Sequence, residues 1–355
     1  MLDFRMVDSS PTRAPSPLLE TLVVGAGVAG LTCAGALRSA GRQVVVLERA
    51  HGIGGRCATR RFDGQGVDFG PLFAHGHHPA FLKALREVEA EPLRDWPRRV
   101  EGGGPPCQPG ALEPTVRRVA FAEGMKAFPR HLARGLEIRL ETRVTGIRAV
   151  PGGFEVVAGD GPPLRCRDLV LALALEQTRR LLDTLEPFPQ AAGLRALLGL
   201  FGSVPCLTVM AGYALDAPVP AWDVLYPEAS DALQLVAQDS TKRAAPRFRT
   251  FVAQARPKWS RQHLDAPTEQ WGRELLDEAA GHLGPWAATP LWTYPHRWRY
   301  ARLGPTSELA EPLRIEFPGG ARLGLAGDVF SPGGGLQAAW LSGIRLADRF
   351  LQEPS

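Results

Sequence analysis

The sequence predicts an α/β fold in which a discontinuous domain, built on a parallel sheet, is joined to a second, mixed α+β domain built on an antiparallel sheet. Residues 20–50 show a compact strand–helix–strand pattern, and residues 321–352 return to a strand, a glycine-rich loop and a helix. Residues 180–300 hold six of the eight tryptophans and several runs of alternating apolar and polar residues. Because βαβ units build parallel sheets and alternating runs build half-buried strands, the chain ends belong together and the middle forms a separate unit.

The first strand–helix–strand unit is short and regular. Leu22–Val24 is an apolar strand, Leu31–Ser39 lies in an alanine-rich helix, and Gly41 is a natural helix stop. Val44–Leu47 is a second apolar strand, which we expect to be buried and parallel to the first.

The remaining elements are predicted in the same way. Helices are expected within 79–90 and 124–135, and residues 136–159 alternate as strands around a Pro-Gly-Gly turn. Cys166–Leu175 is an apolar run typical of a buried strand. Residues 196–215 are uncharged and long enough to raise the question of a membrane span, but glycines and a proline interrupt them. We therefore predict a helix end, a turn and a buried strand there.

Composition excludes several classes of protein. The net charge of +4 over 355 residues is too balanced to indicate nucleic-acid binding. The five cysteines are scattered without a CxxC pair, so neither a disulfide framework nor a zinc site is expected, which fits a reducing cytoplasm. Residues 1–17 lack an apolar stretch and predict a disordered tail, not a signal peptide. We expect a cytoplasmic protein with no nucleic-acid or membrane partner; the oligomeric state is left open.

A glycine motif follows the first strand. Gly25-Ala26-Gly27-Val28-Ala29-Gly30 fits the pattern GxGxxG and opens the first helix. The first glycine permits a tight turn, the second lets phosphate approach the backbone, and the third lets the helix pack closely on the strand. The alternative is an ordinary turn between a strand and a helix.

The acidic residue at the end of the second strand supports dinucleotide binding. Glu48 can accept a hydrogen bond from a ribose hydroxyl, as the dinucleotide fingerprint requires. It also argues against a 2′-phosphate on that ribose, although the neighbouring Arg49 weakens this inference. NAD and FAD use the same half-site, so the motif predicts a dinucleotide without choosing between them.

A second glycine-rich segment favours FAD over NAD as the bound dinucleotide. The sequence GIGGRCATRR at 52–61 resembles the RxGGRxxT/S segment of the FAD-containing amine-oxidase-like superfamily. The resemblance implies that the doublet Gly54-Gly55 lets the backbone pass close to the cofactor, that Arg56 helps balance the pyrophosphate charge, and that Thr59 falls at the hydroxyl position. The upstream arginine often found there is absent. The alternative is a basic surface loop.

A third segment resembles the C-terminal flavin segment of the same superfamily. A strand ends at Gly327-Asp328, and a glycine loop leads through Gly335 to a helix starting near Leu336. The resemblance implies that Asp328 bonds the ribityl or pyrophosphate region and that the helix N-terminus points at the pyrimidine edge of the flavin. Val144 is also assigned to the cofactor site. These segments predict a Rossmann-like domain that binds FAD non-covalently.

The middle of the chain is similar to bacterial renalase-like flavoproteins. The resemblance is carried by four stretches, at 58–70, 124–147, 238–265 and 294–301, the last reading YPHRWRYA. It implies that a small substrate, a 2- or 6-dihydro isomer of NAD(P), gives a hydride to flavin N5, and that molecular oxygen takes up the electrons to give hydrogen peroxide. An amine oxidase, a desaturase or oxidase of a larger apolar or secondary-metabolite substrate, and a non-catalytic flavoprotein remain open alternatives.

Candidate substrate-site residues come from aromatic and histidine-containing stretches. Trp292, Trp298 and Tyr300 could wall the space before the flavin ring, because aromatic faces suit a flat nicotinamide-like substrate; the alternative is that they build the core of the second domain. His75 and His77 could act as bases, and the alternative is a solvated loop. No metal site is predicted. Arg297 and Arg299 could meet a substrate phosphate or merely flank a strand.

The predicted division of the chain follows from these segments. The FAD-binding domain is expected to comprise residues 18–75, 120–180 and 300–355. The substrate domain is expected to comprise residues 76–119 and 181–299.

Overall fold

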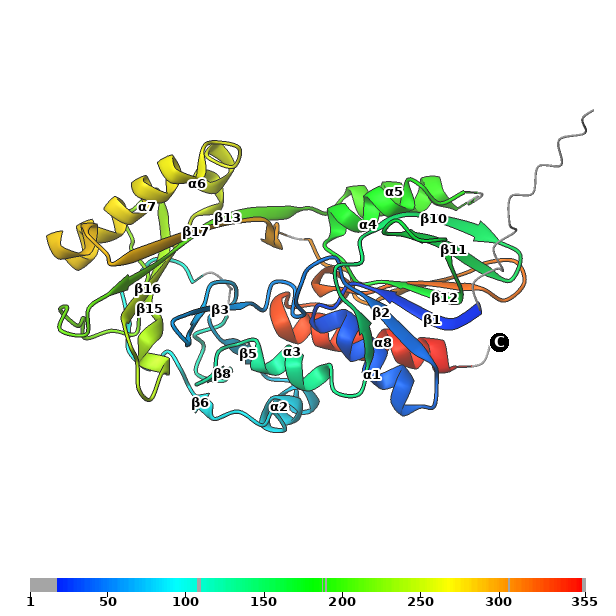
Figure 1. Cartoon of the computed structure of the whole chain (residues 1–355), viewed down its shortest axis with the longest axis horizontal. Coiled ribbons are helices and arrows are strands. Elements are labelled where there is room, and N and C mark those ends of the chain that lie inside the picture. The colour runs from blue at the N-terminus through cyan, green and yellow to red at the C-terminus, as the bar shows by residue number, and fades with distance from the viewer. Residues whose placement is uncertain (1–17, 107–109, 187, 189, 306, 353–355) are drawn as a thin grey trace, which may run out of the picture.

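The computed structural model describes residues 18–106, 110–186, 188, 190–305 and 307–352, so the tail predicted at 1–17 lies outside the described residues. Two sheets with their helices form two bodies, and the long strands β13 and β17 run between them (Figure 1). This arrangement confirms the predicted α/β fold with a second domain built on an antiparallel sheet.

The first sheet has a parallel centre and antiparallel margins. β1 pairs in parallel with both β2 and β12, and apart from the first residues of β1 and β12 the apolar residues of these strands are buried on both faces, as continuous apolar strands require. β12 also pairs in parallel with β19, so the C-terminal segment joins the sheet begun by the N-terminal segment. The parallel strands are β1 (Leu18–Val24), β2 (Val44–Leu47), β9 (Glu137–Arg139), β12 (Leu164–Leu171) and β19 (Arg322–Leu325); the antiparallel strands are β10 (Val144–Val150), β11 (Gly153–Ala158) and β18 (Leu313–Glu316).

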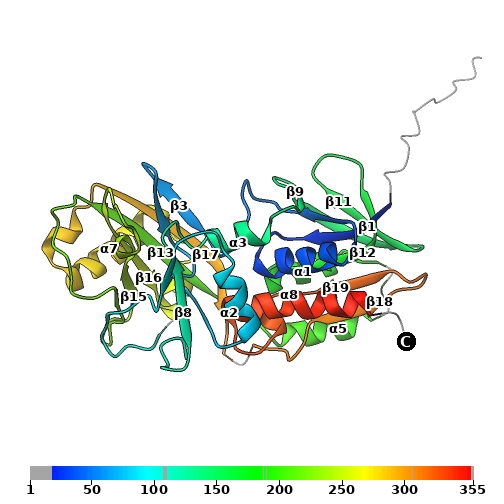
Figure 2. The ribbon, with the colours of Figure 1, turned by 90° about the horizontal axis from the view of Figure 1, so that it is seen from below.

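Helices cover both faces of this sheet (Figures 1 and 2). On one face α1 (Val28–Ser39) lies against α8 (Gly335–Leu351), and a Cβ at Gly343 would stand 2.5 Å from the carbonyl oxygen of Ala29. That close approach explains why a glycine lies in the middle of a long helix. The other face is covered by α4 (Leu175–Leu182) and α5 (Ala191–Gly199). The shorter helices α2 (Pro79–Arg86) and α3 (Ala127–Leu132) flank α8 and α1.

The second sheet has six strands in the order β17-β13-β16-β15-β14-β7. All neighbouring pairs are antiparallel except β14 with β7. Helix α7 (Thr268–Leu283) covers one face and buries Trp271 completely. The strands are β7 (Val100–Glu101), β13 (Ser203–Tyr213), β14 (Val224–Leu225), β15 (Leu233–Gln238), β16 (Arg249–Ala255) and β17 (Trp292–Leu303), and α6 (Pro257–Gln262) precedes α7.

Two small sheets fill the region between the larger ones. A hairpin of β3 (Thr59–Phe62) and β4 (Gln65–Asp68) follows the second glycine segment, and its turn contains Asp63 and Gly64 at positive φ. The other small sheet has the order β5-β8-β6, from β5 (Ala74–Gly76), β6 (Pro92–Arg94) and β8 (Arg117–Phe121). Short 3-10 turns lie at Asp239–Lys242, Pro285–Ala288 and Asp328–Phe330.

The domain boundaries differ in detail from the predicted ones. Leu194 and Leu198 of α5 share a hydrophobic core with the strands of the first sheet, whereas the sequence placed residues after 180 in the second domain. β17 pairs with β13 as far as Leu303, so the second sheet extends beyond the predicted limit at 299. The sequence did not predict these domain boundaries, because contacts between residues far apart in the chain decide which domain α5 and the end of β17 join.

The interrupted apolar stretch at 196–215 contains the end of α5, a turn and the buried strand β13, as predicted. Within the part of the chain that the structure describes, helices that combine the length and the apolar character needed to cross a membrane are absent.

Candidate functional site: a cavity shared by both domains

A large cavity of about 1280 Å³ is lined by residues of both domains. Its volume exceeds the ~300–1000 Å³ that is usual for one drug-sized ligand. One part is lined by the glycine loops and the strand ends of the first sheet, and the other part by β17, α6 and the loop after β4. The cavity therefore has room for a long cofactor together with a second, smaller molecule.

The GxGxxG loop fits a phosphate-bearing ligand. Gly25 has a φ of 108°, and a Cβ there would stand 2.5 Å from the carbonyl oxygen of Ala172. A Cβ on Gly30 would stand 2.0 Å from the carbonyl oxygen of Gly25, so Gly30 serves packing. Gly27 differs from both, because it lines the cavity and a Cβ there would meet no described atom within 4 Å. The protein itself does not need a glycine at position 27, but a ligand lying against the backbone does.

Glu48 lies where β2 ends and is only 9% exposed. Its two carboxylate oxygens accept the backbone N–H groups of Ala26 and Ala50, each at 2.9 Å. These bonds fix the carboxylate at the cavity wall and leave further lone pairs free to accept hydroxyl hydrogens. This geometry suits a ribose.

The second glycine segment, around Gly54 and Gly55, lies beside the GxGxxG loop and pairs with it in parallel at Gly27. The Gly54 N–H donates to the carbonyl oxygen of Ala26 at 2.8 Å, and Gly54 and Gly55 both have positive φ. Arg56 then reaches Asp328 in a two-pronged ion pair, with both N···O distances at 2.8 Å. Burial opposes the charged form of Arg56, but Asp328 outweighs burial and raises the pKa of the guanidinium. The charge of Arg56 is thus already matched by a carboxylate.

The third segment closes the cofactor part of the cavity. Gly333, Gly334 and Gly335 all have positive φ and line the cavity at the start of α8. The unpaired N–H groups at the start of a helix carry partial positive charge, which favours negative charge on a bound ligand. Three separated segments therefore converge on one cavity.

Most of the predicted cofactor residues border this cavity. Gly30 and Thr59 do not line the cavity. Gly30 lies behind the loop. The Thr59 hydroxyl donates to Asp68 at 2.5 Å and accepts from the backbone N–H of Lys126 at 3.0 Å. The predicted residues that do line it are Gly25, Gly27, Ala29, Glu48, Arg49, Gly55, Arg56, Val144, Gly327, Asp328, Gly335 and Leu336.

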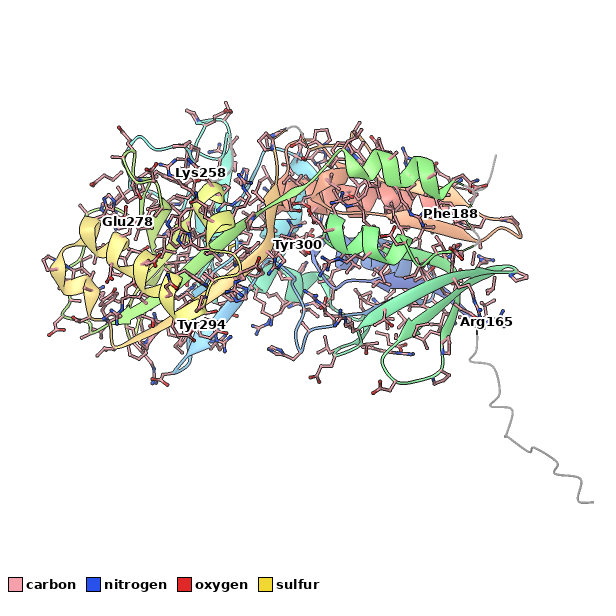
Figure 3. The ribbon with its side chains drawn as sticks, turned by 90° about the horizontal axis from the view of Figure 1, so that it is seen from above. Arg165, Phe188, Lys258, Glu278, Tyr294 and Tyr300 are labelled. Atoms are coloured by element: carbon pink, nitrogen blue, oxygen red, sulfur yellow. The ribbon has the colours of Figure 1, made fainter. Side chains whose placement is uncertain are left out.

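Aromatic rings form part of the opposite wall. The Trp298 indole N–H donates to the carbonyl oxygen of Phe69 at 2.9 Å, and the two rings stack with centroids 5.3 Å apart. His296 packs edge-on against Trp298 at 4.3 Å and also lines the cavity. Tyr300, which lies at the junction of the two bodies in Figure 3, accepts a hydrogen bond from Arg180 at 2.9 Å. Trp298 and Tyr300 thus both border the cavity.

The other substrate-site candidates lie outside the cavity lining. Trp292 stacks on Phe62 of the β3–β4 hairpin, with ring centroids 3.9 Å apart. His75 belongs to β5, and the backbone N–H of His77 donates to Gln337 at 2.9 Å. Trp292 and His75 are partly buried between small elements, whereas the side chain of His77 is exposed. Groups of three or more possible metal ligands are absent among the described residues.

His296 was not among the predicted site residues. Period-2 alternation along β17 places His296 on the same face as Trp298 and Tyr300, and this signal was available in the motif YPHRWRYA. The loop after β4 that carries Phe69 was also missed, because its approach to β17 depends on contacts between residues more than 200 positions apart.

His296 is expected to stay uncharged in the working range of pH. Burial, assisted by the charge of Arg60, lowers the pKa of His296 to about 4. The unfolded chain binds a proton at the ordinary pKa of about 6.5, so His296 makes the free energy of unfolding fall as the pH drops from about 6.5 towards 4. Replacing His296 by glutamine should flatten this part of the stability profile, measured by chemical denaturation at several pH values. An unchanged slope would contradict a buried neutral imidazole.

Comparisons with known proteins agree with this geometry. Residues 23–88 match the NAD(P)-binding Rossmann-like domain, and residues 110–351 match the flavin containing amine oxidoreductase family. The chain also resembles a 15-cis-phytoene desaturase of Synechococcus elongatus (31% identity over 93 residues) and the L-amino acid oxidase Lm29 of Lachesis muta (39% over 87 residues). These matches cover 26% and 24% of this chain, and 20% and 17% of the relatives, so the chain spans only a small part of their length.

Solved structures resemble the fold over nearly its whole length. Putrescine oxidase bound to putrescine superposes with a TM-score of 0.69 at 16% identity, covering 95% of this chain and all of the other. Cyclohexylamine oxidase from Brevibacterium oxydans IH-35A gives 0.70 at 15% identity, with the same coverage. A putative protoporphyrinogen oxidase from Exiguobacterium gives 0.71 at 14%, covering 95% of this chain and 99% of the other. The family match extends over more than half of the sequence, and the chain therefore belongs to the flavin containing amine oxidoreductase family, a family of flavin-dependent enzymes.

Proposed function

We propose that this chain is an FAD-dependent oxidase that takes a hydride from a small, flat substrate, a 2- or 6-dihydro isomer of NAD(P). The observation that carries the proposal is the shared cavity: the glycine loops and Glu48 line one part, and Trp298 and His296 line the part that continues from it. Aromatic walls suit a nicotinamide-like ring, and the volume leaves room for it beside a cofactor.

FAD would be held without a covalent bond. The glycine loops and the start of α8 would receive its pyrophosphate, Glu48 its adenosine ribose, and the Arg56–Asp328 pair would lie beside its central part. When bound, FAD supplies the two-electron acceptor for the hydride. Cys57 lies beside the Arg56 segment, but its thiol is buried and donates to the Met125 carbonyl oxygen at 3.2 Å, so it is not offered for a covalent link.

The protein's own part in the reaction would be orientation and exclusion of water. A dihydronicotinamide that gives up a hydride becomes an aromatic pyridinium, so no protein base has to remove a proton. A neutral His296 packed on Trp298 fits this requirement, since it can orient a ring without adding charge. Molecular oxygen would then accept the two electrons and become hydrogen peroxide.

Amine oxidation is the second candidate, and the comparisons favour it. The family takes its name from amines, short segments resemble L-amino acid oxidases, and the fold resembles putrescine and cyclohexylamine oxidases. An amine substrate would have to be bound as the neutral amine against the same aromatic wall. Desaturation of a larger apolar substrate, suggested by the phytoene desaturase match, would require a longer apolar channel.

Anaerobic mixing distinguishes these functions. The purified holoprotein is mixed with 2-dihydro- or 6-dihydro-NAD(P), with putrescine, with cyclohexylamine or with L-amino acids, and the visible absorbance of the flavin is followed. We expect rapid bleaching by the dihydro isomers and little by the amines. Bleaching by amines or amino acids alone would overturn the proposal in favour of the second candidate.

A further inference from the structure

The part of the cavity lining that comes from α4, α6 and β17 is rich in arginine. Five guanidinium groups from α4, α6 and β17 border the cavity, and we refer to them as the outer arginines: Arg180, Arg261, Arg297, Arg299 and Arg302. The carboxylates among the described lining residues are Glu48, Glu308 and Asp328, and none belongs to α4, α6 or β17. A cleft lined by one sign of charge concentrates ligands of the opposite sign.

Several of these charges are not matched by a carboxylate at contact distance. Arg180 donates to the Tyr300 hydroxyl at 2.9 Å, and Arg297 donates to the carbonyl oxygen of Ala266 at 2.8 Å, so both partners are neutral. Arg261 is exposed on α6, and its guanidinium makes neither a hydrogen bond nor an ion pair with any residue that the structure describes. Its guanidinium is therefore available to a ligand.

The placement of the outer arginines along β17 indicates what kind of ligand reaches them. Side chains alternate along a strand, so Arg297 and Arg299 lie on the face opposite Trp298. Arg299 lies on the side of the α6–α7 connection, where it pairs with Asp265 at 2.7 Å. β17 is the edge strand of its sheet, so its free edge separates the two faces. A molecule that contacts both Trp298 and these arginines must carry a flat ring and an anionic group several bonds apart.

We propose that the outer arginines form an anion subsite that receives the pyrophosphate of the dinucleotide substrate, with Arg261 as the direct contact. The inference rests on the proposed function, and it assigns a binding place to the part of the substrate that does not react. Guanidinium groups bind phosphate oxygens through paired, charge-assisted hydrogen bonds. A small amine has no anionic group for this subsite, and the single carboxylate of an amino acid lies too close to its reacting carbon to span the edge of β17.

Binding of ADP-ribose to the holoprotein tests the subsite without turnover. ADP-ribose carries the pyrophosphate and lacks the nicotinamide, and its dissociation constant is measured by calorimetry. The variant Arg261→Gln should weaken binding at least about tenfold, the usual effect of losing one charge-assisted hydrogen bond. The control is Lys258→Gln, which removes a positive charge from the same helix at an exposed residue that does not line the cavity (Figure 3). Absence of ADP-ribose binding, or equal weakening by both variants, would overturn the subsite.

Turnover separates failure of the subsite from failure of the proposed function. Wild type should be bleached by the dihydronicotinamide dinucleotide far more readily than by the corresponding uncharged dihydronicotinamide riboside, and Arg261→Gln should remove about tenfold of that preference. Bleaching that is equal for the two substrates overturns the subsite and leaves the hydride transfer intact. Loss of bleaching by both, with ADP-ribose binding still dependent on Arg261, overturns the proposed function and leaves the subsite.

Discussion

Replacing Lys242 by methionine is expected to lower the free energy of unfolding by about 3–5 kcal/mol, the usual cost of removing one partner from a buried ion pair. The Lys242 side chain is 0% exposed, and its ammonium group lies 2.6 Å from Asp68 and 2.5 Å from Asp239. Arg243 contacts the same two carboxylates, so the cluster of two cations and two anions is balanced. The variant leaves the buried cluster with one net negative charge, because Arg243 alone then faces both carboxylates.

The same cluster joins the β3–β4 hairpin to the second sheet. Asp68 ends β4 of the hairpin, whereas Lys242 follows β15 of the second sheet. Burial alone would raise the pKa of Asp68, but Lys242 and Arg243 outweigh burial and hold that pKa below its ordinary value. Lys242 also donates to the Leu72 carbonyl oxygen at 3.1 Å, next to the loop that carries Phe69. Its loss should therefore loosen the wall against which Trp298 packs.

Chemical denaturation of the holoprotein measures this effect. The matched control is Lys83→Met, where the side chain is 72% exposed and lies 3.8 Å from Glu87. An exposed pair of this kind is worth at most about 1 kcal/mol, so the control should unfold almost as wild type does. The loss in Lys242→Met should shrink as the pH falls towards the ordinary carboxyl pKa of about 4, because a carboxylate of the cluster can then take up a proton. Equal stability of the two variants at neutral pH would contradict the buried cluster.

Replacing Gly27 by valine is expected to abolish retention of FAD while leaving the fold intact. The Gly27 backbone has φ −78° and ψ 177°, which any residue adopts, and a Cβ there would meet no described atom within 4 Å. The added side chain would instead project into the cavity, where the pyrophosphate would lie against the backbone. The purified variant should be folded by circular dichroism but colourless.

Gly35→Ala provides the control on the same helix. A Cβ at Gly35 would make only an ordinary contact, 3.9 Å from the carbonyl oxygen of Leu132, and Gly35 does not line the cavity. This variant should retain FAD as wild type does. Retention of FAD by Gly27→Val at the wild-type level would show that the phosphate does not approach the chain at this loop.

Local patterns brought most of the residues predicted to bind the cofactor to one cavity. The GxGxxG loop and Glu48 belong to one βαβ unit, so their geometry follows from neighbours in the sequence. The domain limits and the substrate half depend on distant contacts. Trp292 and Trp298 lie on the same face of β17. The β3–β4 hairpin packs against Trp292, whereas Trp298 lines the cavity, and the sequence of the strand does not specify this difference.

The sequence did not predict which charged residues are buried or which residues they pair with. Lys242 lies in the polar stretch QDSTKR, which looks like a solvated turn, yet it is buried because Asp68, 174 residues away, is brought against it. Arg56 was expected to help balance the pyrophosphate charge, and the structure also pairs it with Asp328, 272 residues away. Ion pairs of this kind are set by tertiary structure, since nothing in the local sequence specifies the partner.

The flavin content of the purified chain tests the central claim most directly. We expect a yellow protein that releases one FAD per chain on denaturation, leaves no flavin on the polypeptide, and takes FAD up again after its removal. A colourless protein that fails to bind added FAD would contradict the convergence of the three glycine segments on one cofactor, and the proposed oxidase would fall with it.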